Sequence, residues 1–377
     1  MSFFAKLKVR KKLISAFRSA ELYKTIADDR KIYPKIYAVN IDDETQSTEI
    51  TFSLLNGLNP DLLKKHFYVF QQYFGESIEI DGTIKKFTLT IHNRTMPTEL
   101  PYKFADIQPI VAPYRLGIIC GKDRNGQYHA FDLLEQPHIL IAGETGSGKS
   151  TQLRSILTTL IKTKRPEELQ LYLGDCKRQE FHIFRKVEHV QCVYSSAADI
   201  GRMLVNISKE MDRRSKLTEL YEVSHIDDLP PEHRCPYWVV CIDEFVMLRK
   251  DEDIMAILTE IVAIGRSLGC IAILSMQRPH SKVLDTTIRA NLTVSMGFKL
   301  RDRIEANIVN TPNAEKIEIK GRFIINSDKV REIQAPYLTM EDAKKLLNPF
   351  VVMKGPAKEV TPEEPKQLTE EDVFNAD

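Results

Sequence analysis

The chain has 377 residues, 43% of them hydrophobic and 28% charged, and its formal net charge at pH 7 is +1. This composition is typical of a soluble globular protein, and the length suffices for one large core plus a smaller domain. A near-neutral charge excludes a globally basic nucleic-acid binder, so any such binding needs local basic patches. The six cysteines form no C-x-x-C pair, which argues against a zinc site or a disulfide framework.

The sequence has no apolar run approaching the roughly 18 residues of a membrane span, and basic residues interrupt the N-terminus where a signal peptide would be apolar. We therefore expect a cytoplasmic protein. Residues 1–30 are strongly basic, with seven Lys and Arg against Glu21 within residues 1–24. Apolar residues recur there at roughly helical spacing: Phe3, Leu7, Ile14 and Phe17. The pattern predicts a basic amphipathic helix that docks on the next domain, lies peripherally on an anionic membrane, or touches DNA.

Residues 31–113 are predicted to form a small α+β domain and a linker. KIYAVNI, STEITFSLL, ESIEI and KKFTLTIHN have the pattern of strands, and NPDLLKKHFYVFQQYF has helical periodicity. The four prolines of TMPTELPYKFADIQPIVAPY favour a linker.

Residues 114–350 change to apolar strands that alternate with helices. The candidate strands are ILIAG, QLYLGD, VQCVY, YWVVCID, IAILSM, LTVSMGF and GRFIIN. Continuous apolar runs of this kind suit a mostly parallel sheet covered on both faces, which makes this domain α/β. Residues 351–377 mix Pro, Glu and Lys with few aromatics, so we expect a disordered acidic tail.

The stretch GETGSGKS fits the phosphate-loop pattern G-x-x-x-x-G-K-[ST] and lies between the apolar strand HILIA and the helical segment TQLRSILTTLI. Its glycines allow backbone N–H groups to surround a phosphate, and the helix that follows directs its positive dipole end at the same charge. Lys149 is expected to reach the β- and γ-phosphates of ATP, and Ser150 to ligate Mg²⁺. The predicted nucleotide-binding residues are Gly143, Glu144, Thr145, Gly146, Ser147, Gly148, Lys149, Ser150 and Thr151.

A second acidic element completes the predicted hydrolytic site. The run YWVVCID ends in Asp243, and Glu244 follows it. Asp243 suits the Mg²⁺ shell, and Glu244 suits the role of general base toward the attacking water. The adjacent glutamate favours ATP hydrolysis over nucleotide binding alone.

Two further residues complete the set of catalytic candidates. Gln277 follows the strand IAILSM, where a polar side chain can detect the γ-phosphate. Arg266 follows the helix after the acidic strand, and in ring-forming motors an arginine near this point is offered to the neighbouring subunit's nucleotide. Such an arginine raises hydrolysis by a factor of about 10³–10⁵ in other NTPases. Arg278 and Arg289 compete with Arg266 for the role.

Over roughly residues 48–345 the sequence resembles the FtsK/SpoIIIE family of DNA-translocating ATPases. The matching motifs are Gly121-Lys122-Asp123, Asp132-Leu133, Pro137-His138, Glu210-Met211-Asp212-Arg213-Arg214, Met276-Gln277-Arg278-Pro279 and Ile288-Arg289-Ala290-Asn291. Cys176 is a departure, because Gly174-Asp175-Cys176-Lys177 occupies the position of the family's Asp-Pro-Lys. The resemblance implies a RecA-like motor domain after a small α+β domain, a hexameric ring around double-stranded DNA, and ATP sites between subunits.

The family's cell-division members have N-terminal membrane spans and a C-terminal winged helix, which are not found in this sequence. The expected process is therefore transfer or replication of a plasmid, phage or conjugative element, with a relaxase, a replication initiator or a transfer-channel protein as partner. Candidate channel-facing cations are Lys177, Arg178, Arg213, Arg214, Arg301 and Arg303.

Three other functions remain open. A hexameric helicase acting on single-stranded DNA is the main alternative, because no motif separates tracking a duplex from opening it. A protein substrate, as in type VII secretion, and a scaffold that uses ATP only to assemble are the other two. The complete set Lys149, Ser150, Asp243 and Glu244 argues against the scaffold.

Overall fold

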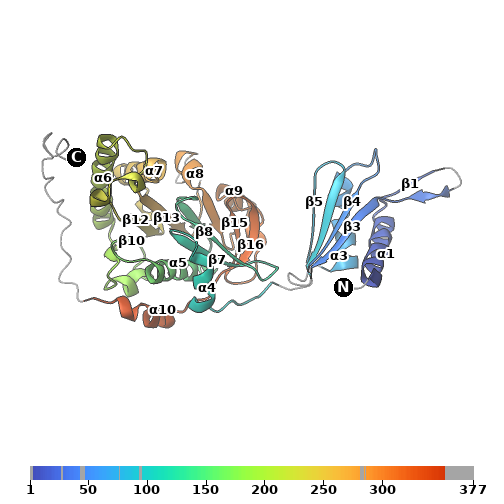
Figure 1. Ribbon diagram of the computed structural model, residues 1–377, viewed down its shortest axis with the longest axis horizontal. Coiled ribbons are helices and arrows are strands. Elements are labelled where there is room, and N and C mark those ends of the chain that lie inside the picture. Colours follow the sequence, from blue (N-terminus) through green and yellow to red (C-terminus); the bar gives the residue numbers. More distant parts are fainter. Residues whose placement is uncertain are drawn as a thin grey trace. The chain divides into compact units, whose positions relative to one another are not determined.

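The computed structural model describes residues 3–26, 29–42, 47–75, 77–92, 96–280, 284 and 286–352. The chain divides into two compact units, which Figure 1 shows as ribbons. The first unit comprises residues 1–97 and 122–127, and the second comprises residues 98–121 and 128–377. Most of the acidic tail expected at 351–377 lies outside the described residues.

The first unit is a four-stranded antiparallel sheet with helices on one side. Its strands follow the order β3 (Lys35–Asp42), β4 (Ser47–Ser53), β6 (Lys86–His92), β5 (Ile78–Gly82). Helices α1 (Phe3–Ser19) and α3 (Phe67–Phe74) lie on the same side of this sheet (Figure 1). The other elements are α2 (Asp61–Lys65) and a short hairpin, β1 (Lys24–Thr25) and β2 (Lys31–Ile32). The helix predicted over residues 59–74 is thus broken at His66, whose φ of −103° and ψ of 20° are not helical.

Helix α1 contributes to the core of the first unit. Phe17 has no exposed surface, and its ring lies 5.0 Å from that of Phe52 and 6.1 Å from that of Phe70. Leu7 and Ile14, which the sequence pattern grouped with Phe17, do not share its buried face, because 41% and 36% of their surfaces are exposed. Residues 7 and 14 are seven apart and share one helix face, whereas the buried residues of α1 lie on another.

The second unit contains a ten-stranded sheet with helices on both faces. In spatial order its strands are β11 (Val190–Tyr194), β10 (Leu169–Asp175), β12 (Tyr237–Asp243), β13 (Cys270–Met276), β9 (Ile139–Ala142), β14 (Val294–Gly297), β15 (Arg322–Asn326), β16 (Val330–Gln334), β7 (Gly117–Lys122) and β8 (Tyr128–Asp132). The first six run parallel, and β15 pairs antiparallel with β14 and β16. This is the predicted α/β class, and β9 to β15 are the seven strands predicted from apolar runs.

Alternate strand residues face two helical layers. Leu171, Leu173 and Val239 pack in one core with α5 (Lys149–Thr163) and α10 (Met340–Leu347). Tyr172, Val240 and Ile242 pack in a second core with α6 (Ala197–Leu220) and α7 (Glu252–Ile264). The remaining helices of this unit are α4 (Phe104–Val111), α8 (Thr286–Asn291) and α9 (Arg303–Ile308).

The proline-rich segment predicted as a linker is instead part of the second unit. It carries α4, in which Ile107 and Val111 are buried and contact Ile119 of β7. Pro109 lies inside this helix, so the four prolines of the segment do not make it an irregular linker. Among the described residues, no helix combines the length and hydropathy that a membrane span requires.

Candidate functional site

The phosphate loop follows β9 and leads directly into α5. Gly146 and Gly148 have φ angles of 80° and 114°, and Gly148 is the N-cap of the helix. A Cβ atom at Gly148 would lie 2.7 Å from the Cα of Gly321, so the loop tolerates only glycine there. Ser147 fixes the curvature, because its Oγ donates to the carbonyl of Glu144 at 2.7 Å and its own carbonyl accepts from the Gly321 N–H at 2.8 Å. The loop is therefore pre-shaped around its backbone N–H groups.

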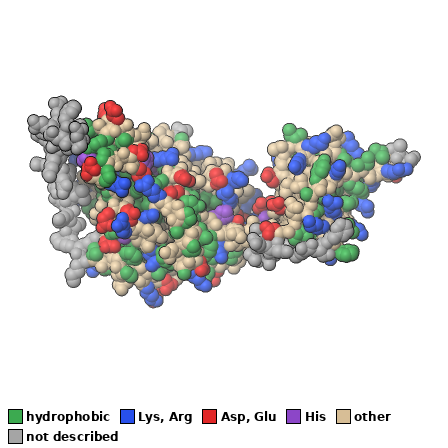
Figure 2. All heavy atoms as spheres, in the orientation of Figure 1, with side chains coloured by type: hydrophobic (Ala, Val, Ile, Leu, Met, Phe, Trp, Pro, Cys, Tyr) green, Lys and Arg blue, Asp and Glu red, His purple; other side chains and the backbone are tan. Residues whose placement is uncertain are grey.

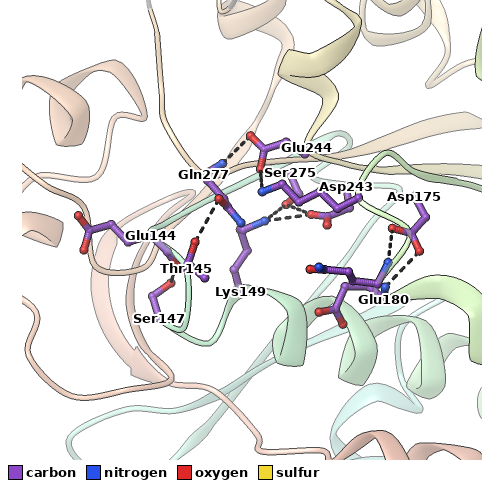
Figure 3. Close-up of polar contacts among 12 residues, drawn as sticks. Glu144, Thr145, Ser147, Lys149, Asp175, Glu180, Asp243, Glu244, Ser275 and Gln277 are labelled. Atoms are coloured by element: carbon purple, nitrogen blue, oxygen red, sulfur yellow. Dashed lines mark hydrogen bonds and ion pairs between the residues drawn. The ribbon is translucent and has the colours of Figure 1, made fainter. Parts of the chain in front are cut away.

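Lys149 points into a buried polar cluster at the carboxyl ends of β12 and β13 (Figure 3). Its Nζ lies 2.9 Å from Asp243 Oδ1 and 2.8 Å from Ser275 Oγ, and Ser275 also donates to Asp243 Oδ1 at 2.9 Å. Only 4% of the Lys149 side chain and 3% of the Asp243 side chain are exposed. The structure thus brings the loop lysine and the predicted magnesium carboxylate into contact.

Glu244 follows β12 in the left-handed region, with φ 58° and ψ 48°. Its Oε1 accepts from the backbone N–H of Gln277 at 3.1 Å, and its Oε2 lies 2.8 Å from Lys177 Nζ. The Gln277 side chain in turn accepts from Thr145 Oγ1 at 3.2 Å. The expected base, the expected sensor and the phosphate loop are therefore joined in one hydrogen-bond chain, much of which is visible in Figure 3.

Asp175 ends β10 and shapes the turn that follows it. Its carboxylate accepts from the backbone N–H groups of Gln179, Glu180 and Phe181 at 3.0–3.1 Å. Burial raises the pKa of Cys176 to about 12, and Asp243 and Asp175 add to the effect, so the thiol stays neutral. The residue that departs from the family motif therefore carries no charge beside the site.

A cavity of about 560 Å³ opens over the phosphate loop. Its loop residues are Glu144, Thr145, Gly146, Gly148, Lys149, Ser150 and Thr151. Gln277 and, from distant segments, Thr98–Leu100, Lys320–Gly321 and Gln334–Tyr337 also line it. The residues fit MgATP, because a glycine cradle, a lysine, a hydroxyl and a nearby carboxylate are the groups that such a ligand needs.

Arg266 is the one predicted catalytic residue that the structure does not bring into this cluster. It is exposed, precedes β13, and donates from Nε to the carbonyl of Leu134 at 3.0 Å. Gln277 follows the other end of β13, and seven residues of strand span about 23 Å. Arg266 therefore lies at the sheet edge opposite the phosphate loop of its own chain.

Sequence reasoning missed two members of the cluster. Ser275 is fully buried within an apolar strand, and a lone polar residue in the run ILSM was the available signal. Lys177 was expected as a DNA-facing cation, whereas here it contacts Glu244. That expectation is wrong for Arg214, which has no exposed surface and bonds Glu210 and the carbonyl of Leu268.

Part of the sequence matches a known protein family. The sequence profile of the FtsK/SpoIIIE family matches residues 110–233. The chain carries an FtsK/SpoIIIE family domain. The matched range includes the phosphate loop and ends before β12, so Asp243 and Glu244 are supported by the structure rather than by this match.

Relatives of the FtsK/SpoIIIE domain include the DNA translocase FtsK of Helicobacter pylori, 29% identical over 247 residues, which cover 62% of this chain and 29% of that protein. The DNA translocase FtsK of Leptospira interrogans is 31% identical over 253 residues, covering 62% and 26%. The chain thus spans less than a third of the length of these two relatives.

Solved structures share the fold of the FtsK/SpoIIIE domain. The pCW3 conjugation coupling protein TcpA, solved with ATPγS, superposes with a TM-score of 0.62 over 90% of this chain and 98% of its own, at 23% identity. The type VII secretion ATPase EccC of Thermomonospora curvata gives a TM-score of 0.58 over 64% and 32%, at 24% identity. The second unit therefore shares its mostly parallel sheet with these ATPases.

Proposed function

We propose that this protein is an ATP-driven translocase that moves along double-stranded DNA as a ring, for the transfer or replication of a mobile genetic element. The observation that carries the proposal is the contact network among the phosphate loop, Asp243, Glu244 and Gln277 in a domain related to DNA translocases. A domain with a hydrolytic base and a γ-phosphate sensor beside its nucleotide cavity has what a motor needs in order to couple turnover to movement.

The residues divide the chemistry among them. Lys149 leaves Asp243 and Ser275 to bind the β- and γ-phosphates, and the loop N–H groups hold the same charge. Ser150 and the released Asp243 would hold Mg²⁺, which would supply positive charge to neutralise the phosphates. Glu244 accepts a proton from the attacking water, and Gln277 contacts the γ-phosphate.

A ring, which we propose to be a hexamer, gives Arg266 a role that its own chain does not offer. Because Arg266 lies at the sheet edge opposite its own phosphate loop, it can reach a nucleotide only in a neighbouring subunit. There its guanidinium would stabilise charge on the transferred phosphoryl group. Arg278 and Arg289, both exposed, are the competing candidates.

The basic helix α1 offers a second contact. Its sequence FFAKLKVRKKLISAFRS contains no acidic residue, and Phe4 and Leu7 are 79% and 41% exposed beside its lysines. Lys and Arg side chains are spread over the face of the first unit seen in Figure 2. Exposed apolar residues among cations suit peripheral binding to an anionic membrane better than binding to DNA alone. Co-sedimentation with vesicles with and without anionic lipid, against duplex DNA, separates the two.

The process and its partners follow from the relatives. TcpA is a conjugation coupling protein by its name, and its fold covers nearly the whole of this chain. A relaxase, a replication initiator or a transfer-channel protein is therefore the proposed partner. A helicase acting on single-stranded DNA is the alternative function, since the same site serves either substrate.

The test is steady-state ATP hydrolysis with no DNA, with duplex DNA and with single-stranded DNA, beside a Lys149→Ala control. The translocase proposal expects hydrolysis that needs Lys149 and rises mainly with duplex. A rise mainly with single strands favours the helicase. If hydrolysis needs Lys149 but its rate changes with neither DNA, a DNA motor is contradicted and a protein substrate is favoured.

A further inference from the structure

Each carboxylate oxygen of Glu244 accepts one hydrogen bond within the chain. Oε2 forms an ion pair with Lys177 Nζ at 2.8 Å, and Oε1 accepts from the Gln277 backbone N–H at 3.1 Å. A general base must present a lone pair to water, and a charge-assisted bond to an ammonium withdraws one. The carboxylate of Glu244 is therefore shared with Lys177, which competes with water for it.

Lys177 is presented to Glu244 by a fixed turn. It lies two residues beyond β10, which pairs with β12 in a register that sets Asp175 opposite Asp243. The Asp175 carboxylate anchors the turn through the N–H groups of Gln179, Glu180 and Phe181. The backbone turn that carries Lys177 is thus tied to the end of β10 by the Asp175 carboxylate.

The two partners differ in their access to solvent. The Lys177 side chain is 26% exposed, whereas the Glu244 side chain is only 10% exposed. The Lys177 side chain is therefore more open to an approaching anion than the carboxylate that it contacts. Duplex DNA brings about one phosphate charge per 1.7 Å of its axis, and lysine is a suitable point-charge partner for phosphate.

We propose that Lys177 is a positioning residue that holds Glu244 in a resting geometry, and that a DNA phosphate releases Glu244 by competing for the ammonium. The inference rests on the proposed function, since it takes Glu244 as the base and DNA as the substrate. It adds a reason why DNA should stimulate hydrolysis: Glu244 stays in an ion pair with Lys177 until a DNA phosphate binds Lys177 in its place.

The first experiment compares ATP hydrolysis with and without duplex DNA for the wild type, Lys177→Met, Lys177→Arg and Lys186→Met. Lys186 is an exposed lysine outside the site and serves as the matched control. Lys177→Met is expected to raise the DNA-free kcat about two- to fivefold, the range of a partly exposed ion pair, with an unchanged KM for ATP. The ratio of stimulated to DNA-free rate should fall by the same factor. Lys177→Arg and Lys186→Met should keep the wild-type ratio.

The opposite pattern overturns the proposal. If Lys177→Met lowers both rates by one factor and leaves their ratio intact, Lys177 supports the chemistry and does not restrain it. If the ratio is intact and KM rises, Lys177 binds the nucleotide.

A second measurement does not need turnover. Thermal unfolding of Lys177→Met, Glu244→Gln and the double variant, followed by the fluorescence of Trp238, tests the pair itself. With the pair present, the double variant should melt at about the temperature of the less stable single variant. If the Tm shift of the double variant equals the sum of the two single shifts, the Lys177–Glu244 contact is contradicted, whereas the proposed function is not. If the Lys149→Ala protein hydrolyses ATP at the wild-type rate, the proposed function is contradicted. Failure of the proposed function can thus be distinguished from failure of the Lys177–Glu244 proposal.

Discussion

Replacing Lys149 by methionine should destabilise the nucleotide-free second unit as well as abolish its activity. The ammonium lies 2.9 Å from Asp243 Oδ1, and the two side chains are 4% and 3% exposed. Removing one partner of a buried ion pair leaves an uncompensated charge and costs about 3–5 kcal/mol of folding free energy. The hydrogen bond from Ser275 to Asp243 survives and offsets about 1 kcal/mol, so we expect a loss of about 2–4 kcal/mol.

The assay is urea unfolding of the nucleotide-free protein, with Trp238 as the probe. Trp238 is the chain's single tryptophan and lies on β12, the strand that ends in Asp243, so its fluorescence reports this unit. The expected loss corresponds to a midpoint lowered by about 1 M urea. The double variant Lys149→Met/Asp243→Asn should recover more than half of the loss, because the buried charge is gone. A Lys149→Met protein within about 0.5 kcal/mol of wild type, or a double variant less stable than the single one, would refute the reasoning.

Three further predictions concern Glu244, Arg266 and His138. Glu244→Gln should reduce kcat at least about 10²-fold while nucleotide binding, followed with a fluorescent ATP analogue, persists; a smaller loss means that another group is the base. Mixing Lys149→Ala chains with Arg266→Ala chains, each inactive alone, should restore part of the hydrolysis, and a mixture as inactive as its parents excludes Arg266 as a trans-acting residue. His138 is buried and its Nδ1 accepts from the Ala272 N–H at 3.1 Å; burial, with a smaller contribution from Arg266, lowers its pKa from 6.5 to about 4. Between those two values the unfolded chain holds a proton that the folded chain does not, so stability should fall as the pH drops through that window, by up to about 3 kcal/mol. His138→Asn, which tolerates the left-handed backbone at φ 60°, should flatten this dependence in urea titrations at pH 4.5 and 7, and an unchanged slope would contradict it.

The features that were predicted correctly are encoded in short, contiguous stretches of sequence. Buried parallel strands such as β10 and β12 are continuous apolar runs, and the phosphate loop is recognisable from its glycines and from the strand and helix beside it. The proximity of Lys149 and Asp243 can also be expected from the sequence, because parallel strands place their carboxyl ends at one edge of the sheet.

The features missed depend on residues distant in sequence. Lys177 reaches Glu244 across 67 positions, and Lys149 reaches Ser275 across 126, so no local pattern encodes either contact. The face of α1 was misjudged because its basic segment carries apolar residues on two sides, and only the position of the sheet decides which side is buried. The prolines that suggested a linker gave no sign that Ile107 and Val111 would pack against β7.

The most direct test of the central claim is displacement of a labelled third strand from a DNA triplex. A duplex carrying a triplex-forming oligonucleotide is incubated with the protein and MgATP, and release of the oligonucleotide is followed together with separation of the duplex strands. The account predicts ATP-dependent release that is lost in Glu244→Gln, with the duplex left intact. Strand separation without triplex release, or release that does not need hydrolysis, would contradict an ATP-driven translocase on double-stranded DNA.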